Sequence, residues 1–322
     1  MAREGLRVLV TGGAGYVGTA VCEALSSEGH CPVVLDVTPP KKSGTAYVGA
    51  DVRDSLSVFK ALESNRIDSL VHCAALVSVS ESFLRPHDYA SCNAGGTIAL
   101  MDAVRRYGAI ESMVLASSAA VYGTAHPGVI SEEEAACPIS PYGESKLEAE
   151  RIMSQTAEDM DAGCCILRLF NVAGSWGAAS DRPESGHLVP VVADSISSRR
   201  GLNICGADWT TSDGTCIRDY VHVRDVGGAF VLAATAVGGR IGAVNIGSGK
   251  GTSVLEVIDA AEALEGYRPV IHNCDRRNGD PPCLVASINK AERELGWTPQ
   301  HSSIGEILDS VFAYSRSLFR CL

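Results

Sequence analysis

The chain has 322 residues, of which 46% are hydrophobic and 20% are charged, and it carries a net charge of -11. This length and composition exclude a disordered chain and fit one large domain or two closely associated domains. The 27 basic and 38 acidic residues include no basic run interleaved with aromatic side chains, so we expect no nucleic acid partner.

The first seven residues form no apolar signal segment, and no apolar run has the length needed to cross a bilayer. We therefore expect a cytoplasmic protein without a membrane partner. The twelve cysteines are scattered, lie mostly in apolar runs and show no Cys-x-x-Cys spacing. We interpret them as buried free thiols rather than disulfides, and we predict no metal site.

A strand, a glycine-rich turn and a helix open the chain. Residues 8–10 form an apolar run typical of a buried parallel strand, and residues 19–27 are predicted to be helical. Between and beside them stand Gly12, Gly13, Gly15 and Gly18. Glycines here allow unusual dihedral angles and let the backbone approach a pyrophosphate at the helix N-terminus. The turn therefore predicts a dinucleotide site.

An acidic residue follows the second predicted strand. This strand covers residues 31–35 and ends in Asp36, eighteen residues after Gly18. A carboxylate at this position accepts hydrogen bonds from the adenosine ribose hydroxyls and repels a 2′-phosphate. The pattern therefore favours NAD over NADP as the cofactor.

A third predicted strand, residues 46–50, leads to Asp51 and Val52. We weigh two roles for Asp51, and both can hold together. It is placed to cap a helix predicted over residues 55–63, and it is also placed to bind the adenine amino group while Val52 packs on the ring.

Strands and helices continue to alternate up to residue 160. We predict strands over 69–73 and 112–116 and long helices over 89–107 and 142–160. Asn93, an amide in a stretch of small residues, is expected to brace the neighbouring strand. This alternation predicts an α/β fold with a doubly wound parallel sheet of the Rossmann type.

The regular alternation loosens after residue 172. We predict a helix ending at Ser198 and a strand with a helix in 213–236, followed by a strand over 244–246 and helices over 253–264, 288–295 and 304–318. The second half is therefore expected to form a smaller α/β lobe that interleaves with the first. We place the domains at residues 1–172 and 173–322, with segments around 215–250 returning to the first.

A tyrosine and a lysine lie one helical turn apart in the helix over 142–160. Tyr142 and Lys146 share one helical face, and Ser118 follows the preceding predicted strand. A nearby cation stabilises a phenolate, so we expect the pKa of Tyr142 to fall from about 10 toward neutrality. The phenolate can then accept a proton from a substrate hydroxyl, with Ser118 relaying it. Lys146 is also placed to hold the nicotinamide ribose.

Six stretches of the chain together resemble one known family, the extended short-chain dehydrogenase/reductases, and within them most closely the UDP-glucose 4-epimerases. The likeness runs from about residue 6 to residue 297 and is carried by residues 10–18, 117–123, 141–146, 167–171, 213–223 and 277–280. The stretch Asp213 to Val223 is the most specific, since it is similar to the sugar-nucleotide signature of that family.

The resemblance assigns residues to three roles. It implies that the cofactor NAD is contacted by Tyr16, Val17, Asp36, Asp51, Val52, Asn93, Lys146 and Phe170. It implies that Ser118 and Tyr142 handle the proton of a sugar hydroxyl. It further implies that a UDP-sugar is held by Asn171, Arg218, Arg277 and Asp280. Guanidinium groups suit this role because they bind phosphates through paired hydrogen bonds.

The activity implied by the resemblance is inversion of C4 of a UDP-hexose, with UDP-galactose and UDP-glucose as the favoured pair. The reaction passes through a 4-keto sugar while NAD stays bound, and a homodimer is implied through the helices over 93–107 and 142–160. Ala119 and Ala120 supply no acid pair for a 4,6-dehydratase. UDP-N-acetylglucosamine or UDP-glucuronate 4-epimerases, an NAD-dependent sugar-nucleotide dehydrogenase and a non-catalytic NAD-binding regulator remain as alternatives.

Three residues depart from the family pattern. His187 stands where many members have an asparagine that contacts the substrate, and Val77 replaces a lysine near the nicotinamide. Leu284 occupies the position that resembles the gate for N-acetylated sugars. Its intermediate size leaves acceptance of UDP-N-acetylglucosamine open.

Overall fold

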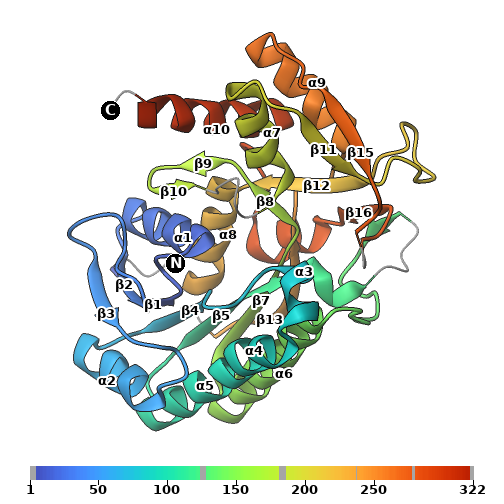
Figure 1. Cartoon of the computed structure of the whole chain (residues 1–322). Coiled ribbons are helices and arrows are strands. Elements are labelled where there is room, and N and C mark those ends of the chain that lie inside the picture. Colours follow the sequence, from blue (N-terminus) through green and yellow to red (C-terminus); the bar gives the residue numbers. More distant parts are fainter. Residues whose placement is uncertain (1–4, 124–127, 181–185, 237, 278–279, 320–322) are drawn as a thin grey trace.

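A seven-stranded parallel sheet forms the centre of one part of the molecule (Figure 1). The computed structural model describes residues 5–123, 128–180, 186–236, 238–277 and 280–319. The strand order is β3-β2-β1-β4-β5-β7-β13, and every pair is parallel. The strands are β1 (Arg7–Thr11), β2 (Cys31–Asp36), β3 (Ala46–Gly49), β4 (Ser69–His72), β5 (Ser112–Ser118), β7 (Gly163–Leu169) and β13 (Arg240–Ile246). The direction of winding reverses at β1, where α/β sheets of this kind bind ligands.

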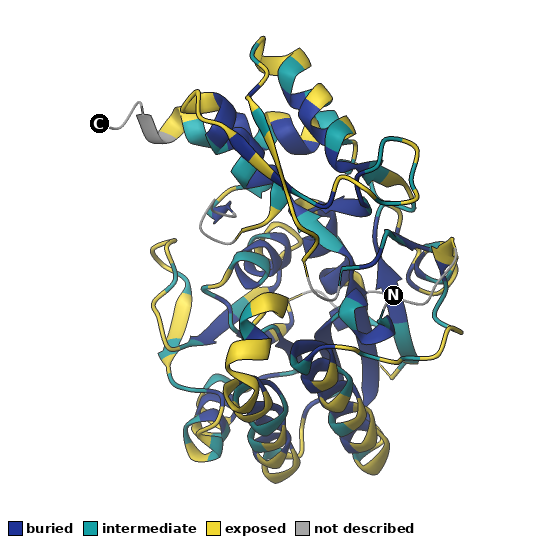
Figure 2. Cartoon of the chain, turned by 45° about the vertical axis from the view of Figure 1, so that its right-hand side comes forward, coloured by how far each residue is buried: buried dark blue, intermediate teal, exposed yellow. Residues whose placement is uncertain are grey.

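Helices cover both faces of this sheet. Val8 and Val10 pack in the apolar cluster that contains α1 (Tyr16–Ser27) and α8 (Val223–Thr235). Leu9 packs in the cluster beneath α2 (Ser55–Asn65), α5 (Gly96–Tyr107) and α6 (Pro141–Met160), whose outer surfaces are exposed in Figure 2. Because alternate residues meet opposite layers, the strands are apolar without interruption. The predicted doubly wound α/β fold is confirmed.

A smaller lobe lies in the upper half of Figure 1, above the large sheet and its helices α2, α5 and α6. Its main sheet joins β6 (Val129–Ile130), β16 (Cys283–Ala286), β12 (Ile217–His222) and β14 (Gly251–Ser253), and β8 (Asn171–Ala173) also pairs with β12. Two further pairs are β9 (Ser175–Trp176) with β10 (Ala179–Ser180) and β11 (Leu202–Cys205) with β15 (Ile271–Cys274). One apolar cluster holds α7 (Leu188–Ser197), α9 (Val254–Glu265) and α10 (Ile304–Phe319) against these strands.

The chain crosses between the two parts more than once. β13 follows β12 and α8 in sequence but pairs with β7 in the large sheet. In the opposite direction, β6 comes from the first half of the chain and pairs with β16 of the smaller lobe. Through these crossings the smaller lobe and the large sheet share chain segments, and the candidate residues Phe170 and Asn171 lie where β7 of the large sheet leads into β8 of the smaller lobe.

Several elements differ from their predicted form. The helix predicted over 89–107 consists of α4 (Pro86–Tyr89), a π-helical turn (Ala90–Gly95) and α5, and it follows the short helix α3 (Val79–Leu84). We predicted no strand at β7, although all seven of its residues are buried. The segment predicted to be helical over 288–295 ends in a π-helical turn (Ala291–Leu295). The remaining predicted strands and helices are confirmed to within a few residues at their ends.

The described cysteines are all free, as predicted. Their predicted burial holds for Cys22, Cys164, Cys165 and Cys216, but Cys31, Cys137 and Cys274 are exposed. Cys31 is the first residue of β2, and burial along this strand begins only at Val33. Within the described part of the chain, no helix combines the length and the apolar composition of a membrane span.

Candidate active site

The turn between β1 and α1 is packed closely against the end of β4. Gly12 has a φ of +67°, and a Cβ atom added there would lie 2.6 Å from the backbone nitrogen of Ala74. A Cβ atom on Gly18 would lie 2.1 Å from the carbonyl oxygen of Gly12. Gly15 is the N-cap of α1 and makes no side-chain cap, so the helix N-terminus offers backbone N–H groups to a ligand. The turn therefore fits the pyrophosphate of a dinucleotide.

Replacing Gly12 by alanine is expected to destabilise the protein and to abolish retention of NAD. The new Cβ atom meets backbone atoms of Ala74, which cannot move aside as a flexible side chain would. We expect a loss of about 2–4 kcal/mol in the free energy of unfolding, measured by urea denaturation together with assay of released NAD. Gly29→Ala is the matched control, because Gly29 has a φ of +80° with nothing within 4 Å of its added Cβ atom. Equal effects of the two substitutions would contradict the prediction.

Asp36 ends β2 beside the glycine turn, at the position predicted for ribose recognition. Its Oδ2 accepts a hydrogen bond from the N–H of Ala14 (3.0 Å), and its Oδ1 accepts from the N–H (3.0 Å) and hydroxyl (3.1 Å) of Thr38. These bonds hold the carboxylate next to the turn. The arrangement fits a cofactor with free ribose hydroxyls.

The structure corrects one of the two roles predicted for Asp51. The cap of α2 is Asp54, whose side chain accepts a hydrogen bond from the N–H of Ser57 (3.1 Å). An N-cap must directly precede the first helical residue, and Asp51 lies too early. Asp51 instead accepts hydrogen bonds from the N–H (2.9 Å) and guanidinium (2.6 Å) of Arg53, and the Arg53 side chain lowers the pKa of Asp51. Val52 is buried, and the adenine contacts of both residues stay predictions.

Asn93 braces the segment after β4, as predicted. Its Oδ1 accepts a hydrogen bond from the N–H of Leu76 (2.8 Å), and its Nδ2 donates to the Leu76 carbonyl (3.0 Å) and to Ser145 Oγ (2.9 Å). Ser145 Oγ donates in turn to the carbonyl of Tyr142 (2.8 Å). Asn93 lies in the π-helical turn, a geometry common at functional sites. We had not predicted Ser145, although its place between Tyr142 and Lys146 marked it as a polar residue near the inner helical face.

The hydroxyl of Ser118 lies beside the phenol of Tyr142 and acts to lower the pKa of Tyr142. Ser118 is the last residue of β5, and Tyr142 is the second residue of α6, whose N-cap Ser140 accepts a hydrogen bond from the N–H of Gly143 (3.1 Å). Lys146 follows one turn later in α6. Tyr142 and Lys146 are 8% and 4% exposed, so both ionisable groups lie out of bulk water.

Burial shifts the pKa of both groups away from the charged form. It raises the pKa of Tyr142, and the Ser118 hydroxyl opposes this rise. The direction is opposite to the predicted one, because loss of hydration disfavours the phenolate more than Ser118 favours it. Burial also lowers the pKa of Lys146 to about 8. The ammonium form of Lys146 is therefore present below about pH 8 and is lost as the pH rises.

The strand β7 leads through Phe170 into β8. Phe170 is buried with Val121 and Tyr122, which follow Ser118 in a 3-10 turn. Asn171 pairs in register with Tyr220 of β12 and is partly exposed. This connection brings the predicted cofactor contact Phe170 and the predicted substrate contact Asn171 next to the segment that carries Ser118.

The guanidinium of Arg218 is buried but incompletely paired. Its Nη1 donates to the carbonyl of Ile217 (2.9 Å), and its Nη2 lies 3.4 Å from Asp280 Oδ1. That contact lacks hydrogen-bond geometry, and Nη2 has no hydrogen-bond partner among the described residues. A buried cationic N–H group without a partner is costly unless a ligand satisfies it. The site therefore fits an anion such as a diphosphate.

Arg277 and His187 are both exposed. The charges of Arg218 and Arg277 both lower the pKa of Cys216, which places the two guanidinium groups around one residue, although burial raises that pKa overall. The carbonyl of Arg277 accepts a hydrogen bond from the N–H of Asp280 (3.3 Å). Gly279 of the same motif lies outside the described residues. His187 is the N-cap of α7 and uses no side-chain bond for this capping.

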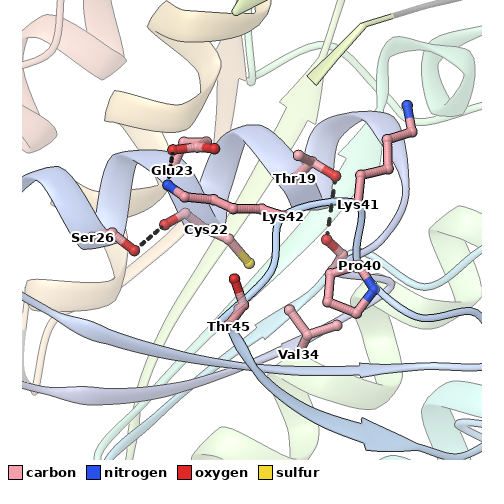
Figure 3. Close-up of a pocket in the computed structure, with 10 residues that line it drawn as sticks. Thr19, Cys22, Glu23, Ser26, Val34, Pro40, Lys41, Lys42 and Thr45 are labelled. Atoms are coloured by element: carbon pink, nitrogen blue, oxygen red, sulfur yellow. Dashed lines mark hydrogen bonds and ion pairs between the residues drawn. The ribbon is translucent and has the colours of Figure 1, made fainter. Parts of the chain in front are cut away.

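A small pocket of ≈ 20 Å³ lies between α1 and the segment that follows Asp36 (Figure 3). Lys42 of this segment forms an ion pair with Glu23 of α1 (2.7 Å), which holds the segment against the helix. The pocket is lined by Gly13 of the glycine turn but by neither Tyr142 nor Arg218, so it adjoins the candidate cofactor site and not the proposed proton-transfer residues. The ion pair between Lys42 and Glu23 joins the segment after Asp36 to α1.

Comparison with known proteins places this geometry in a family. Residues 8–247 match the model of the NAD dependent epimerase/dehydratase family. The chain belongs to this family. It is 37% identical to the UDP-glucose 4-epimerase of Azospirillum brasilense, over 97% of this chain and 92% of that one. Among solved structures it is similar to the UDP-glucose 4-epimerase of Stenotrophomonas maltophila with bound NAD and formylated UDP-arabinopyranose (TM-score 0.92, 32% identity, 98% and 100% of the chains). It is also similar to the UDP-glucose 4-epimerase of Brucella ovis in complex with NAD (TM-score 0.89, 34%, 96% and 98%).

Val77 and Leu284, two of the residues that depart from the family pattern, have defined positions in this structure. Val77 follows Leu76, whose backbone is held by Asn93, and its side chain is 59% exposed. Leu284 lies on β16 opposite Arg218 of β12 and packs against the cluster that contains Phe170. Leu284 therefore stands between the cofactor side and the anion side of the candidate site.

Proposed function

We propose that this protein is a UDP-glucose 4-epimerase that interconverts UDP-galactose and UDP-glucose with tightly bound NAD. The observation that carries the proposal is the placing of Ser118 beside Tyr142, with buried Lys146 one helical turn away. Arg218 supports it, because its buried Nη2 has no hydrogen-bond partner among the described residues. Bound NAD supplies a hydride acceptor that returns the hydride to the opposite face of the sugar. The glycine turn, Asp36, Asp51, Val52, Asn93 and Phe170 are the residues proposed to hold it.

Proton transfer is assigned to Tyr142 and Ser118. Tyr142 Oη accepts the proton of the sugar 4-hydroxyl and later returns it, while Ser118 hydrogen-bonds the same oxygen and favours the phenolate. Lys146 holds the nicotinamide ribose, and its ammonium charge supports the phenolate. The bond from Ser145 to the Tyr142 carbonyl and the brace by Asn93 fix the helix turn that carries these groups.

Binding of the substrate is assigned to its nucleotide part. Arg218 and Arg277 pair with the diphosphate, Asp280 binds the uridine ribose, and Asn171 and His187 contact neighbouring groups. Tight binding of the nucleotide leaves the sugar free to turn over, so that either face of C4 meets the hydride. The binding energy then comes from the nucleotide and not from the atoms around C4. Contacts that do not hold the sugar in one orientation leave kcat high.

The two parts of the chain then divide the work. Residues 1–172, together with the returning segments α8 and β13, form the NAD-binding domain, and residues 173–322 form most of the sugar-nucleotide lobe. We also propose a homodimer through the outer faces of α5 and α6, where Ile98 is 51% exposed. Light scattering is expected to give twice the chain mass of 33.7 kDa, and the mass of a single chain would contradict the dimer.

The first experiment is to purify the protein without added cofactor and to assay a denatured portion for released NAD. The remainder is incubated with UDP-galactose alone. Formation of UDP-glucose without net NADH is expected. Retained NAD without conversion would point to UDP-N-acetylglucosamine or UDP-glucuronate as the substrate, and activity only with added cofactor would indicate a dehydrogenase. Retained NAD with no turnover of any UDP-sugar would support a non-catalytic regulator.

A further inference from the structure

A buried ion pair joins the catalytic helix to the large sheet. Glu150 lies in α6, one helical turn after Lys146, and Arg168 lies in β7. Arg168 Nε donates to Glu150 Oε1 (3.0 Å) and Arg168 Nη2 donates to Glu150 Oε2 (2.7 Å). The two side chains are only 9% and 8% exposed. This two-point pairing fixes the rotation of α6 relative to β7.

The same pair also holds the chain on both sides of Ser118. The hydroxyl of Ser117 donates to Glu150 Oε1, and Arg168 Nη1 donates to Tyr122 Oη (3.0 Å). Tyr122 Oη donates in turn to Asn245 Oδ1 (2.7 Å). Both oxygens of the carboxylate and all three guanidinium nitrogens are therefore engaged. The network limits the freedom of Ser118, because Ser117 directly before it and Tyr122 four residues after it are bound to the same two charges.

A contribution to the stability of the fold does not by itself explain why the ion pair of Glu150 and Arg168 is buried beside α6. A buried ion pair is often no more stabilising than apolar side chains of the same volume, because both charges lose their hydration. Its effect on neighbouring charges, however, extends over several ångströms in a medium of low polarity. Lys146 is the nearest catalytic group on the same helix.

The groups around Lys146 leave Glu150 as its source of negative charge. Cys73 follows β4, Cys92 lies in the π-helical turn, and burial raises the pKa of Cys73 to about 12 and that of Cys92 above its usual value. Both thiols are therefore neutral near pH 7. His72 of β4 is neutral as well, since burial lowers its pKa to about 3. Among the described residues that act on Lys146, Glu150 is thus the anion, and it favours the ammonium form.

We propose that Glu150 and Arg168 are positioning residues for the reaction: together they set the place of Ser118 and the balance of charge beside Lys146. The proposal rests on the proposed function, because it gives Lys146 a role in turnover. The effect of the pair on the charge of Lys146 does not depend on which substrate is bound. Removing either member of the pair leaves the other charge unbalanced near the ammonium group.

The two single substitutions are expected to act in opposite directions. Glu150→Gln leaves the guanidinium of Arg168 unbalanced, so the pKa of Lys146 falls. Arg168→Met leaves the carboxylate unbalanced, so the pKa of Lys146 rises. Each change is expected to be about one pH unit. The double substitution Glu150→Gln with Arg168→Met is expected to lie between the two, and Arg168→Lys, which keeps the charge, is expected to lie near the parent protein.

The pKa of Lys146 can be read directly by nuclear magnetic resonance. The chain has six lysines, so labelling lysine Cε with carbon-13 gives six signals, and Lys146→Arg identifies the one that belongs to Lys146. This readout needs no substrate, so it tests the pair even if the protein does not act on UDP-galactose. A second readout is the pH profile of kcat, whose alkaline limb is expected to move to lower pH in Glu150→Gln and to higher pH in Arg168→Met.

Asp225→Asn is the matched control, because Asp225 is a buried carboxylate of α8 that accepts hydrogen bonds from Gln300, His301 and Ser302. This control is expected to lower the melting temperature without moving the Lys146 titration. If Glu150→Gln and Arg168→Met shift that titration in the same direction, or leave it in place, the proposal is overturned and the pair is structural only.

Discussion

Replacing Tyr142 by phenylalanine is expected to lower kcat for UDP-galactose epimerisation by about 10³-fold or more, because only the phenol oxygen is assigned to move the proton. The ring stays in its buried position, so NAD and UDP are expected to remain bound. Because the buried ring is kept, the free energy of unfolding is expected to fall by no more than about 1 kcal/mol. Steady-state kinetics measures kcat, assay of released NAD and calorimetric titration with UDP measure binding, and urea denaturation measures the free energy of unfolding.

Tyr89 offers a matched control for this substitution. Its ring contacts that of Tyr142 edge-on, with centroids 6.3 Å apart, and it is fully buried. Its hydroxyl bonds to Glu81 (3.1 Å) and to the N–H of Ser78 (3.1 Å), away from Ser118. Tyr89→Phe is expected to keep kcat within about tenfold of the parent protein. Tyr142→Phe with kcat in the same range would remove Tyr142 from the mechanism.

Replacing Arg218 by methionine is expected to weaken UDP binding about 100-fold, since charged hydrogen bonds to a phosphate contribute roughly 1.5–3 kcal/mol each. The substitution removes a buried cation whose Nη2 has no hydrogen-bond partner among the described residues. We therefore expect the melting temperature to stay the same or to rise, because the desolvation cost of that group disappears. Loss of affinity without loss of stability is the pattern of a group kept for its ligand.

A second arginine separates this effect from a change of net charge. Arg240 begins β13 and forms an ion pair with exposed Asp161 (2.6 Å), whereas the candidate residues Asp36 and Ser118 end their strands of the same parallel sheet. Arg240→Met changes the net charge equally and is expected to leave the Kd for UDP within about threefold. Calorimetric titration of both variants with UDP decides the matter, and equal weakening in the two would assign the effect to overall charge.

The local parts of the candidate site could be predicted from sequence because their geometry depends on neighbouring residues. The glycine turn, the carboxylate at the end of β2 and the spacing of Tyr142 and Lys146 each follow from a strand, a turn or a helix formed by adjacent residues. The cap of α2 was misplaced by three residues, since Asp51 and Asp54 both stand before the helix and only the observed backbone shows which carboxylate accepts its N–H group.

The sequence by itself determined the doubly wound α/β fold, the dinucleotide turn and the tyrosine–lysine helix, because periodicity and glycine placement act over short stretches of chain. Only the tertiary structure decided how Arg218 and Asp280 meet, how Asn93 reaches Leu76 and Ser145, and how Glu150 pairs with Arg168. These contacts join residues on separate elements. The tertiary structure also reversed the expected direction of the pKa shift of Tyr142. Burial depends on packing across the whole fold, and loss of hydration is the largest influence on a buried charge.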